Sequence, residues 1–176
     1  MSDYRQDPPP DELIEMIFYK DGSLYWKPEF CKGNRKENKP IGYVDKYGYK
    51  CFTSTIGQEN KAYRGYKVHR VIFYIITGEW PPVVDHKDRN TLNNDISNLR
   101  SATWVDNGAN REKSIVNTSG YVGVRPRGKK FSAVISKDDK CYEVRGFHDA
   151  KHAALFRDLM AHYTQGSFAN FNILGK

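Results

Sequence analysis

The sequence of 176 residues contains few cysteines and no paired ones. Cys31, Cys51 and Cys141 lie far apart, and none belongs to a CxxC pair. An odd number of scattered cysteines argues against a disulfide framework and against a structural zinc site. No apolar run approaches the roughly 18 residues of a membrane-spanning helix, and the acidic, proline-rich start does not resemble a signal peptide. These absences predict a cytoplasmic protein with no membrane partner and no structural zinc.

Acidic residues are also scarce relative to basic ones, 21 against 28, which gives a formal net charge of +7. The excess is concentrated in residues 117–176, which hold 10 basic and 5 acidic residues, whereas residues 1–116 hold 18 and 16. A basic balance of this kind attracts polyanions such as nucleic acids. The length and the hydrophobic content of 39% predict two compact modules.

The first module is predicted to be rich in short strands. Residues 1–12 are polar and proline-rich and predict a flexible tail. Up to residue 68, short apolar runs alternate with turn residues such as Asp21-Gly22, a pattern typical of a small antiparallel sheet. The apolar run 69–78 ends at Gly78 and predicts a buried helix with a glycine stop.

Beyond this module the pattern changes twice. Thr103 is predicted to cap a short helix over 104–113, and the small polar residues 114–120 indicate a linker. Three strand-like runs and a helix then follow, which predict a three-stranded antiparallel sheet packed on one helix. The strands are expected at 121–125, 130–136 and 140–147, and the helix between Asp149 and Gly166, with Ala150, Ala153, Phe156, Met160 and Tyr163 on its apolar face.

The stretch VVDHKDRNTLNNDISNLR, residues 83–100, contains the main candidates for catalytic and metal-binding residues. Hydrolysis of a phosphodiester near neutral pH needs a base to activate water and a cation to stabilise the developing charge. Adjacent side chains on a strand point to opposite faces, so Asp85 can offer an oxygen to a hard divalent cation while His86, whose pKa suits a base, faces the water. Asn107 on the short helix offers a second ligand; Asn110 is the competing residue, and we favour Asn107.

The pattern VHR, VDHKDRN, NNDISNLR and DN, within residues 40–112, resembles the HNH nucleases with the ββα-metal fold, in particular phage and intron homing enzymes. The resemblance implies that His86 is the general base and that Asp85 and Asn107 hold one divalent ion, Mg²⁺ or alternatively Mn²⁺. It also implies that Asn98 fixes the loop by bonding backbone. The family has a histidine at the position of His69, to which we assign a packing or loop-bonding role rather than catalysis.

Residues 118–172 resemble the DNA-binding domain of plant APETALA and ethylene-response factors, through GVR, the F-A-I alternation, GF, an Ala-rich helix and the closing A-N-F-N. The resemblance implies that the sheet enters the major groove. Alternation predicts Phe131, Ala133 and Ile135 against the helix, with Ser132, Val134 and Ser136 outward. Glu143 stands where the plant proteins have tryptophan, so the target sequence does not transfer, and Glu143 is expected to repel phosphate. The residues predicted to contact DNA are Arg125, Arg127, Lys129, Lys130 and Arg145.

These features together predict an α+β protein: a β-rich N-terminal segment with an HNH nuclease domain over 13–113, a linker over 114–120 and a DNA-binding domain over 121–176. The predicted function is site-specific cleavage of double-stranded DNA by a homing-type endonuclease, acting as a monomer or as a homodimer on DNA. If the protein is phage-encoded, it acts in the host cytoplasm. The alternatives are a non-catalytic DNA-binding regulator that uses the HNH fold as a scaffold, and a restriction-type HNH nuclease.

Overall fold

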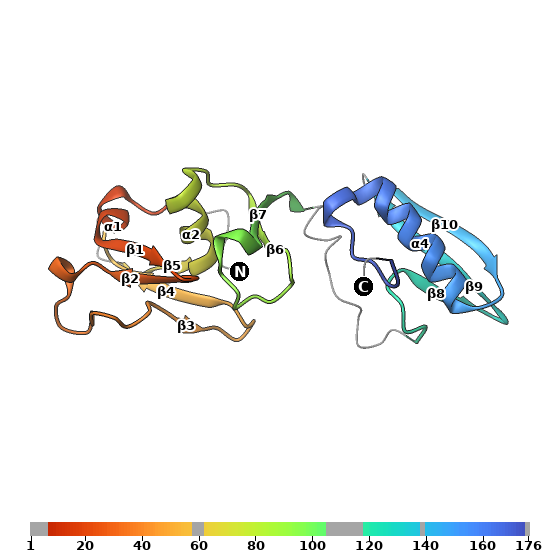
Figure 1. Ribbon diagram of the computed structural model, residues 1–176, viewed down its shortest axis with the longest axis horizontal. Helices are drawn as coiled ribbons and strands as arrows, with labels where there is room; N and C mark the ends of the chain where they lie inside the picture. The colour runs from red at the N-terminus through yellow and green to blue at the C-terminus, as the bar shows by residue number, and fades with distance from the viewer. Residues whose placement is uncertain (1–6, 58–61, 105–117, 138–139, 175–176) are drawn as a thin grey trace. The chain divides into compact units, whose positions relative to one another are not determined.

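The computed structural model describes residues 7–57, 62–104, 118–137 and 140–174 (Figure 1). The chain divides into two compact units, residues 1–102 and 103–176, called here the N-terminal and the C-terminal unit. Both combine short helices with small antiparallel sheets, so the predicted α+β class is confirmed. In the described ranges no helix has the length and apolar character needed to span a membrane.

In the N-terminal unit, the described residues form three small antiparallel sheets, made by β1–β2, by β3–β4–β5 and by β6–β7. The predicted turn at Asp21-Gly22 joins β1 to β2, and both of its residues have positive φ. The elements are α1 (Asp11–Met16), β1 (Ile17–Lys20), β2 (Ser23–Trp26), η1 (Pro28–Phe30), β3 (Tyr43–Val44), β4 (Lys50–Ser54), β5 (Arg64–Lys67), α2 (Val68–Thr77), β6 (Val83–His86), η2 (Ile96–Asn98) and β7 (Leu99–Ala102).

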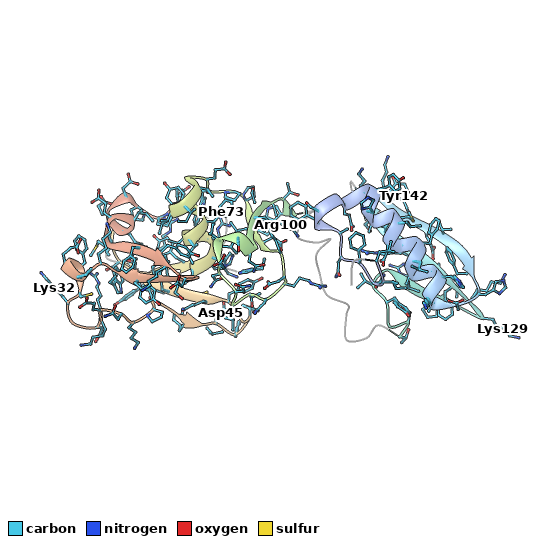
Figure 2. All side chains as sticks on the ribbon, in the orientation of Figure 1. Lys32, Asp45, Phe73, Arg100, Lys129 and Tyr142 are labelled. Atoms are coloured by element: carbon cyan, nitrogen blue, oxygen red, sulfur yellow. The ribbon has the colours of Figure 1, made fainter. Side chains whose placement is uncertain are left out.

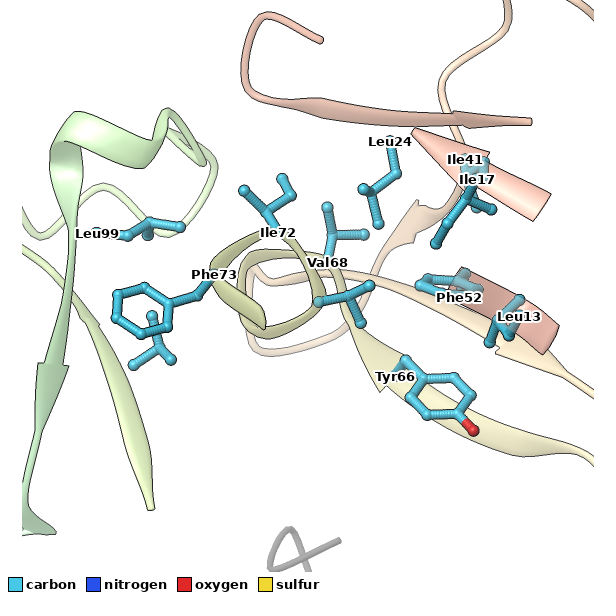
Figure 3. Close-up of a cluster of buried hydrophobic side chains, with 12 residues drawn as sticks. Leu13, Ile17, Leu24, Ile41, Phe52, Tyr66, Val68, Ile72, Phe73 and Leu99 are labelled. Carbon is cyan, nitrogen blue, oxygen red and sulfur yellow. The ribbon is translucent and has the colours of Figure 1, made fainter. Parts of the chain in front are cut away.

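Helix α2 forms the centre of this unit, and its apolar sequence explains why. Val68, Val71 and Ile72 have no exposed surface, because strands lie around the helix on several sides. Figure 3 shows α2 end-on, with Phe73 directed toward Leu99 of β7 and with Ile72 on the side of Leu24. The helix ends at Gly78 in the left-handed conformation, φ 73°, which glycine adopts without steric cost. The predicted buried helix and its glycine stop are therefore confirmed.

The described residues of the C-terminal unit form one three-stranded sheet in the order β10-β9-β8, with α4 packed on one face (Figure 1). Ala133 and Ile135 of β9 are buried, and Phe131 packs against the core. Asp149 caps α4, since its Oδ1 accepts a hydrogen bond of 2.9 Å from the His152 backbone N–H. The elements are β8 (Val124–Arg127), β9 (Lys130–Lys137), β10 (Lys140–Phe147), α4 (Ala150–Gln165) and η3 (Gly166–Phe168).

Two predicted boundaries are wrong. Asp11 and Glu12, expected in a flexible tail, belong instead to α1, whose first turn is anchored by the Pro10 carbonyl, and Pro9 is already buried. The strand expected over 121–125 runs instead over Val124–Arg127, because Tyr121 and Gly123 form a turn before it, with Gly123 at φ 68°. The short helix predicted over 104–113, with Asn107 and Asn110, and most of the linker lie outside the described residues.

The buried face of α4 also differs from the prediction. Tyr163, expected on the apolar face, is 87% exposed, whereas Arg157 and Asp158 are buried. The apolar spacing failed here because these two charged residues bind the C-terminal segment. Arg157 donates to the Asn170 carbonyl, and the Asp158 carboxylate accepts backbone N–H groups of Asn172, Ile173 and Leu174 at 2.7 to 3.1 Å.

Asn172 completes this connection by joining α4 to the start of the sheet. Its side chain accepts from the Val122 N–H at 2.6 Å, and donates to the Val122 carbonyl at 3.0 Å and to Asp158 at 3.1 Å. Asp158 has no exposed surface, so water cannot replace its partners in the folded state. The polar closing residues of the chain are therefore part of the interior.

Replacing Asp158 by alanine should lower the free energy of unfolding of the C-terminal unit by about 3 kcal/mol, because several buried N–H groups lose their acceptor. Hydrogen exchange of the β9 amides measures this loss. Lys151→Ala, on the exposed side of α4, is the control. A change within about 0.5 kcal/mol for Asp158→Ala would show that the carboxylate does not anchor the segment.

Candidate functional site

The hairpin β6–β7 positions the two side chains that the sequence singles out. Its register pairs Asp85 with Arg100 and His86 with Leu99. All four residues of β6 are buried, including Asp85 at 6% and His86 at 4% exposed surface. Ionisable side chains are rarely buried to this degree without specific partners, and both have them.

His86 is held by a carboxamide. Its Nε2 lies 2.9 Å from Oδ1 of Asn94, and Asn94 is itself only 2% exposed. A carboxamide oxygen can only accept, so Nε2 carries the proton and donates it to the bond. In a neutral imidazole with its proton on Nε2, the lone pair is on Nδ1. Asn94 is a loop residue whose side chain is buried against the histidine.

Asp85 is paired with its cross-strand neighbour on β7. The Nε and Nη2 atoms of Arg100 donate to Oδ2 of Asp85 at 2.9 and 2.7 Å. The side chains are 16% and 7% exposed, and Figure 2 labels Arg100 on this hairpin. A charge-assisted bidentate contact in a largely desolvated position fixes the carboxylate and keeps a positive charge beside it.

The loop between the two strands is organised by Asn98. Its Oδ1 accepts the Asp88 backbone N–H at 3.0 Å, and its Nδ2 donates to the Asn93 carbonyl at 2.8 Å and to Asp88 Oδ1 at 2.9 Å. Burial acts to raise the pKa of Asp88, but hydrogen bonds from Asn93, Asn90 and Asn98 lower it overall. The loop therefore returns the chain to β7 in one conformation, with Asn94 beneath His86.

His69 of α2 lies directly against the site. Its ring centroid is 4.8 Å from that of His86 and 5.5 Å from that of Tyr49. Burial, followed by the charges of His86, Lys67 and Arg70, lowers the pKa of His69 well below 6.5. The Lys67 ammonium lies 3.5 Å from the centroid of the Tyr49 ring. His69 is thus a neutral packing partner of His86, and Lys67 adds a cation near the pair.

The residues that could hold a metal ion are only partly described. Asp85 provides the carboxylate oxygen that Mg²⁺ prefers, whereas Asn107 and Asn110 lie outside the described residues. Among the residues that the structure describes, no group of three or more His, Cys, Asp and Glu side chains is arranged for a metal ion. On the described part of the chain, Asp85 therefore supplies one oxygen donor for such an ion.

A pocket of about 320 Å³ lies on the N-terminal unit beside β3, β4 and β5. Aromatic and basic side chains predominate in its lining, and two of its tyrosines, Tyr43 and Tyr47, are 58% and 63% exposed. Aromatic rings together with cations are the groups that bind nucleic acid through stacking and charge. The aromatic and basic lining residues are Tyr43, Tyr47, Phe52, Tyr66, Trp80, Lys46, Lys67 and Arg70.

On the C-terminal unit the predicted DNA-contacting cations are all exposed. The register pairs both Arg125 and Arg145 with Ser132 of the central strand, and Arg127 with Lys130. The four cations in these pairs, Arg125, Arg127, Lys130 and Arg145, share the face of the sheet opposite α4. Lys129 lies at the tip of the β8–β9 hairpin (Figure 2). Ser132 and Val134 are on this outward face as predicted, yet both are buried.

Glu143 lies between two of these arginines. Nε and Nη2 of Arg127 donate to its Oε1 at 3.0 and 2.8 Å, and the same atoms of Arg145 donate to its Oε2 at 3.0 and 2.7 Å. Hydrogen bonds from Arg145, Ser132 and Arg127 lower the pKa of Glu143 to about 2. We call this cluster of Arg127, Glu143 and Arg145 the arginine clamp.

Sequence reasoning missed three of these partners, and the signals for them differ in strength. Arg100 could have been found, because a hairpin with Asp85 on one strand places a β7 residue opposite it. The sequence drew attention to Glu143 only because the plant DNA-binding domains have tryptophan there, and it did not indicate the two arginine partners. No pattern in NND distinguishes the buried Asn94 from its only partly buried neighbour Asn93, because the difference depends on how the whole loop folds.

Stability of the N-terminal unit should fall as the pH decreases below about 6.5, because the unfolded chain then takes up a proton on His69 that the folded unit disfavours. The contribution of neutral His69 to the free energy of unfolding is therefore complete above about pH 6.5. As the pH falls below this value, it is lost at up to about 1.4 kcal/mol per pH unit. Urea unfolding followed by tryptophan fluorescence between about pH 7.5 and 5 measures it. His69→Leu should show a shallower dependence; identical slopes would contradict the assignment.

Comparisons with known proteins agree with the location of this site. Residues 66–109, which include α2, β6 and β7, match the family model described as HNH endonuclease. The chain is also 36% identical over 107 residues to a protein of Acanthamoeba polyphaga mimivirus named as an uncharacterized HNH endonuclease. That similarity covers 58% of this chain and 55% of the relative, so the chain spans about half the length of the curated protein it matches. No solved structure matches the chain. The chain is thus similar to HNH endonucleases over the segment that carries Asp85 and His86, and the resemblance of residues 118–172 to plant DNA-binding domains stays a prediction.

Proposed function

We propose that the protein is a metal-dependent endonuclease that hydrolyses phosphodiester bonds of double-stranded DNA at specific sites. The observation that carries this proposal is the buried pair of Asp85 and His86 on one hairpin, each oriented by a partner of its own, inside the segment that matches HNH endonucleases. A strand that needed only to pack would gain more stability from apolar residues than from two buried ionisable groups.

In this proposal His86 is the general base. Because its Nε2–H is donated to Asn94, the ring can accept a proton from water only at Nδ1. The bond to Asn94 also stabilises the imidazolium that forms, since the carboxamide oxygen keeps accepting from the charged ring. The neighbouring His69 stays neutral through burial, so it adds no second positive charge when His86 is protonated.

Asp85 and Asn107 would hold one divalent ion, Mg²⁺ or Mn²⁺. When bound, such an ion stabilises negative charge on the phosphate and on the departing oxygen. Arg100 keeps the Asp85 carboxylate in place from one side and contributes positive charge at the same hairpin. Lys67 and the aromatic and basic pocket beside β3, β4 and β5 supply further contacts for a DNA backbone.

We further propose that the C-terminal unit determines where the nuclease cuts. Its sheet presents Arg125, Arg127, Lys130 and Arg145 on one face, the groups that contact phosphates and guanine bases in the major groove. Tethering this reader to the nuclease raises the local concentration of the active site at the bound sequence. A homing role is part of the same proposal, with nicking by a monomer and a double-strand cut by a homodimer on DNA as its two forms.

His86→Ala should remove cleavage of supercoiled plasmid in the presence of Mg²⁺ and leave DNA affinity unchanged, because only the base is lost. A general base contributes roughly 10²- to 10⁴-fold in rate, so the residual rate should fall by at least about 100-fold. Gel analysis separates nicked from linear product and thereby distinguishes single-strand from double-strand cleavage.

His148→Ala, at an exposed histidine of the C-terminal unit, is the matched control and should cut like the unmodified protein. Equal cutting by His86→Ala would overturn the base assignment. Tight DNA binding without any cleavage by the unmodified protein, with Mg²⁺ or Mn²⁺, would instead support a regulator that keeps the fold as a scaffold.

Truncation after Ser114 should weaken DNA binding and spread cleavage over many sites, because the phosphate contacts of the C-terminal unit are lost. The dependence of affinity on salt should become shallower by about 0.9 for each phosphate contact removed. Fluorescence anisotropy with labelled duplex at several salt concentrations measures both effects. Unchanged affinity and an unchanged salt slope would refute the role of the C-terminal unit as reader.

A further inference from the structure

The arginine clamp is an unusual arrangement for a surface expected to bind a polyanion. A carboxylate at the centre of a basic sheet repels phosphate and lowers the local positive charge. Glu143 is nevertheless the less exposed member: its side chain is 17% exposed, against 45% for Arg127 and 70% for Arg145. The acid thus lies beneath the two guanidinium groups, and the arginines are the groups that a ligand would meet.

Stability of the fold does not explain this arrangement. Ion pairs with partners as exposed as Arg127 and Arg145 contribute little to folding. Arg127 also reaches Glu143 from β8 across the central strand β9, since β10 and β8 both pair with β9 and not with each other. The clamp therefore fixes two long side chains over the sheet, above Ser132 and Val134, and this accounts for the burial of those two outward residues.

The chemistry of the guanidinium group leaves it able to bind a second partner. Each arginine has five N–H donors in one plane, and two of them, on Nε and Nη2, bind Glu143. The two Nη1 hydrogens and the second Nη2 hydrogen form the outer end of the guanidinium group. That end matches the O6 and N7 acceptors of guanine in the major groove.

We propose that Glu143 is a specificity-determining positioning residue, which orients Arg127 and Arg145 for end-on contact with guanine bases. The inference rests on the proposed role of the C-terminal unit as a DNA reader. Glu143 itself makes no base contact, because both of its oxygens are occupied by arginine. By fixing the two guanidinium groups before binding, it reduces the conformational entropy lost on recognition. By neutralising one of two positive charges, it weakens binding to phosphates of unrelated sequences.

For Glu143→Gln we therefore expect lower discrimination between sequences together with higher affinity for unrelated DNA. The variant releases the two arginines, so the ratio of affinity for the preferred site to affinity for unrelated duplex should fall about ten-fold, within the range of one bidentate arginine–guanine contact. Affinity for unrelated duplex should rise, and its salt dependence should become steeper. A side chain needed only for folding or solubility would not lower discrimination while raising non-specific binding.

The experiment uses the full chain in EDTA, which prevents cleavage. The preferred duplex is first selected from a randomised pool with the unmodified protein, and affinities for it and for a scrambled duplex are then measured by anisotropy at several salt concentrations. Glu79→Gln, an exposed acid of the N-terminal unit, makes the same change in net charge and is the matched control. Glu143→Gln in an Arg145→Ala background should lose less discrimination than in the unmodified chain, because one of the two oriented groups is already absent.

The outcomes separate this inference from the function it rests on. If the unmodified protein binds no duplex, or the pool yields no preferred sequence, the reader function and the inference both fail. If it discriminates and Glu143→Gln discriminates equally well, the reader function stands and the positioning role of Glu143 is overturned. Reduced discrimination in Glu79→Gln of the same size would also overturn it, because net charge alone would then explain the result.

Discussion

The proposed chemistry depends on one buried hydrogen bond, from the Nε2–H of His86 to the carboxamide oxygen of Asn94. It determines which ring nitrogen carries the lone pair, and so where water would have to lie to be activated. The bond exists because the loop from Lys87 to Asn98 is closed by its own polar side chains, above all Asn98 and Asp88. A hairpin with an ordinary solvated loop would leave the imidazole free to rotate. The structure of the loop therefore determines which ring nitrogen of His86 would accept the proton.

Acidic residues have organising roles in a basic protein. Asp85 accepts hydrogen bonds from Arg100 on the β6–β7 hairpin. Asp158 accepts the backbone N–H groups of Ile173 and Leu174, and Glu143 binds Arg127 and Arg145 over the sheet. In each case a carboxylate directs donors that would otherwise be flexible or unsatisfied. The excess of positive charge supplies attraction to a polyanion, while these few carboxylates supply orientation. This division would suit the proposed endonuclease, which has to find DNA and to act at one place on it.

Much of this architecture could be predicted from local sequence patterns. The turn at Asp21-Gly22, the helix ending at Gly78 and the cap at Asp149 follow from preferences of single residues and were all confirmed. Features that depend on distant parts of the chain were missed. Asn94 is a loop residue by composition and a buried partner by packing, and Arg157 and Asp158 occupy an interior position because the chain end returns to them. The spacing of apolar residues along a helix does not predict a charged residue that is buried because its side chain binds backbone groups.

The most direct test of the account is the protonation of the two ring nitrogens of His86, measured by ¹⁵N NMR on labelled protein at about pH 8, where an ordinary imidazole is neutral. The account predicts a protonated Nε2 and an unprotonated Nδ1, with a scalar or nuclear Overhauser contact linking the Nε2 proton to the Asn94 side chain. A His86 ring that carries its proton on Nδ1, or that exchanges freely between both forms, would contradict it.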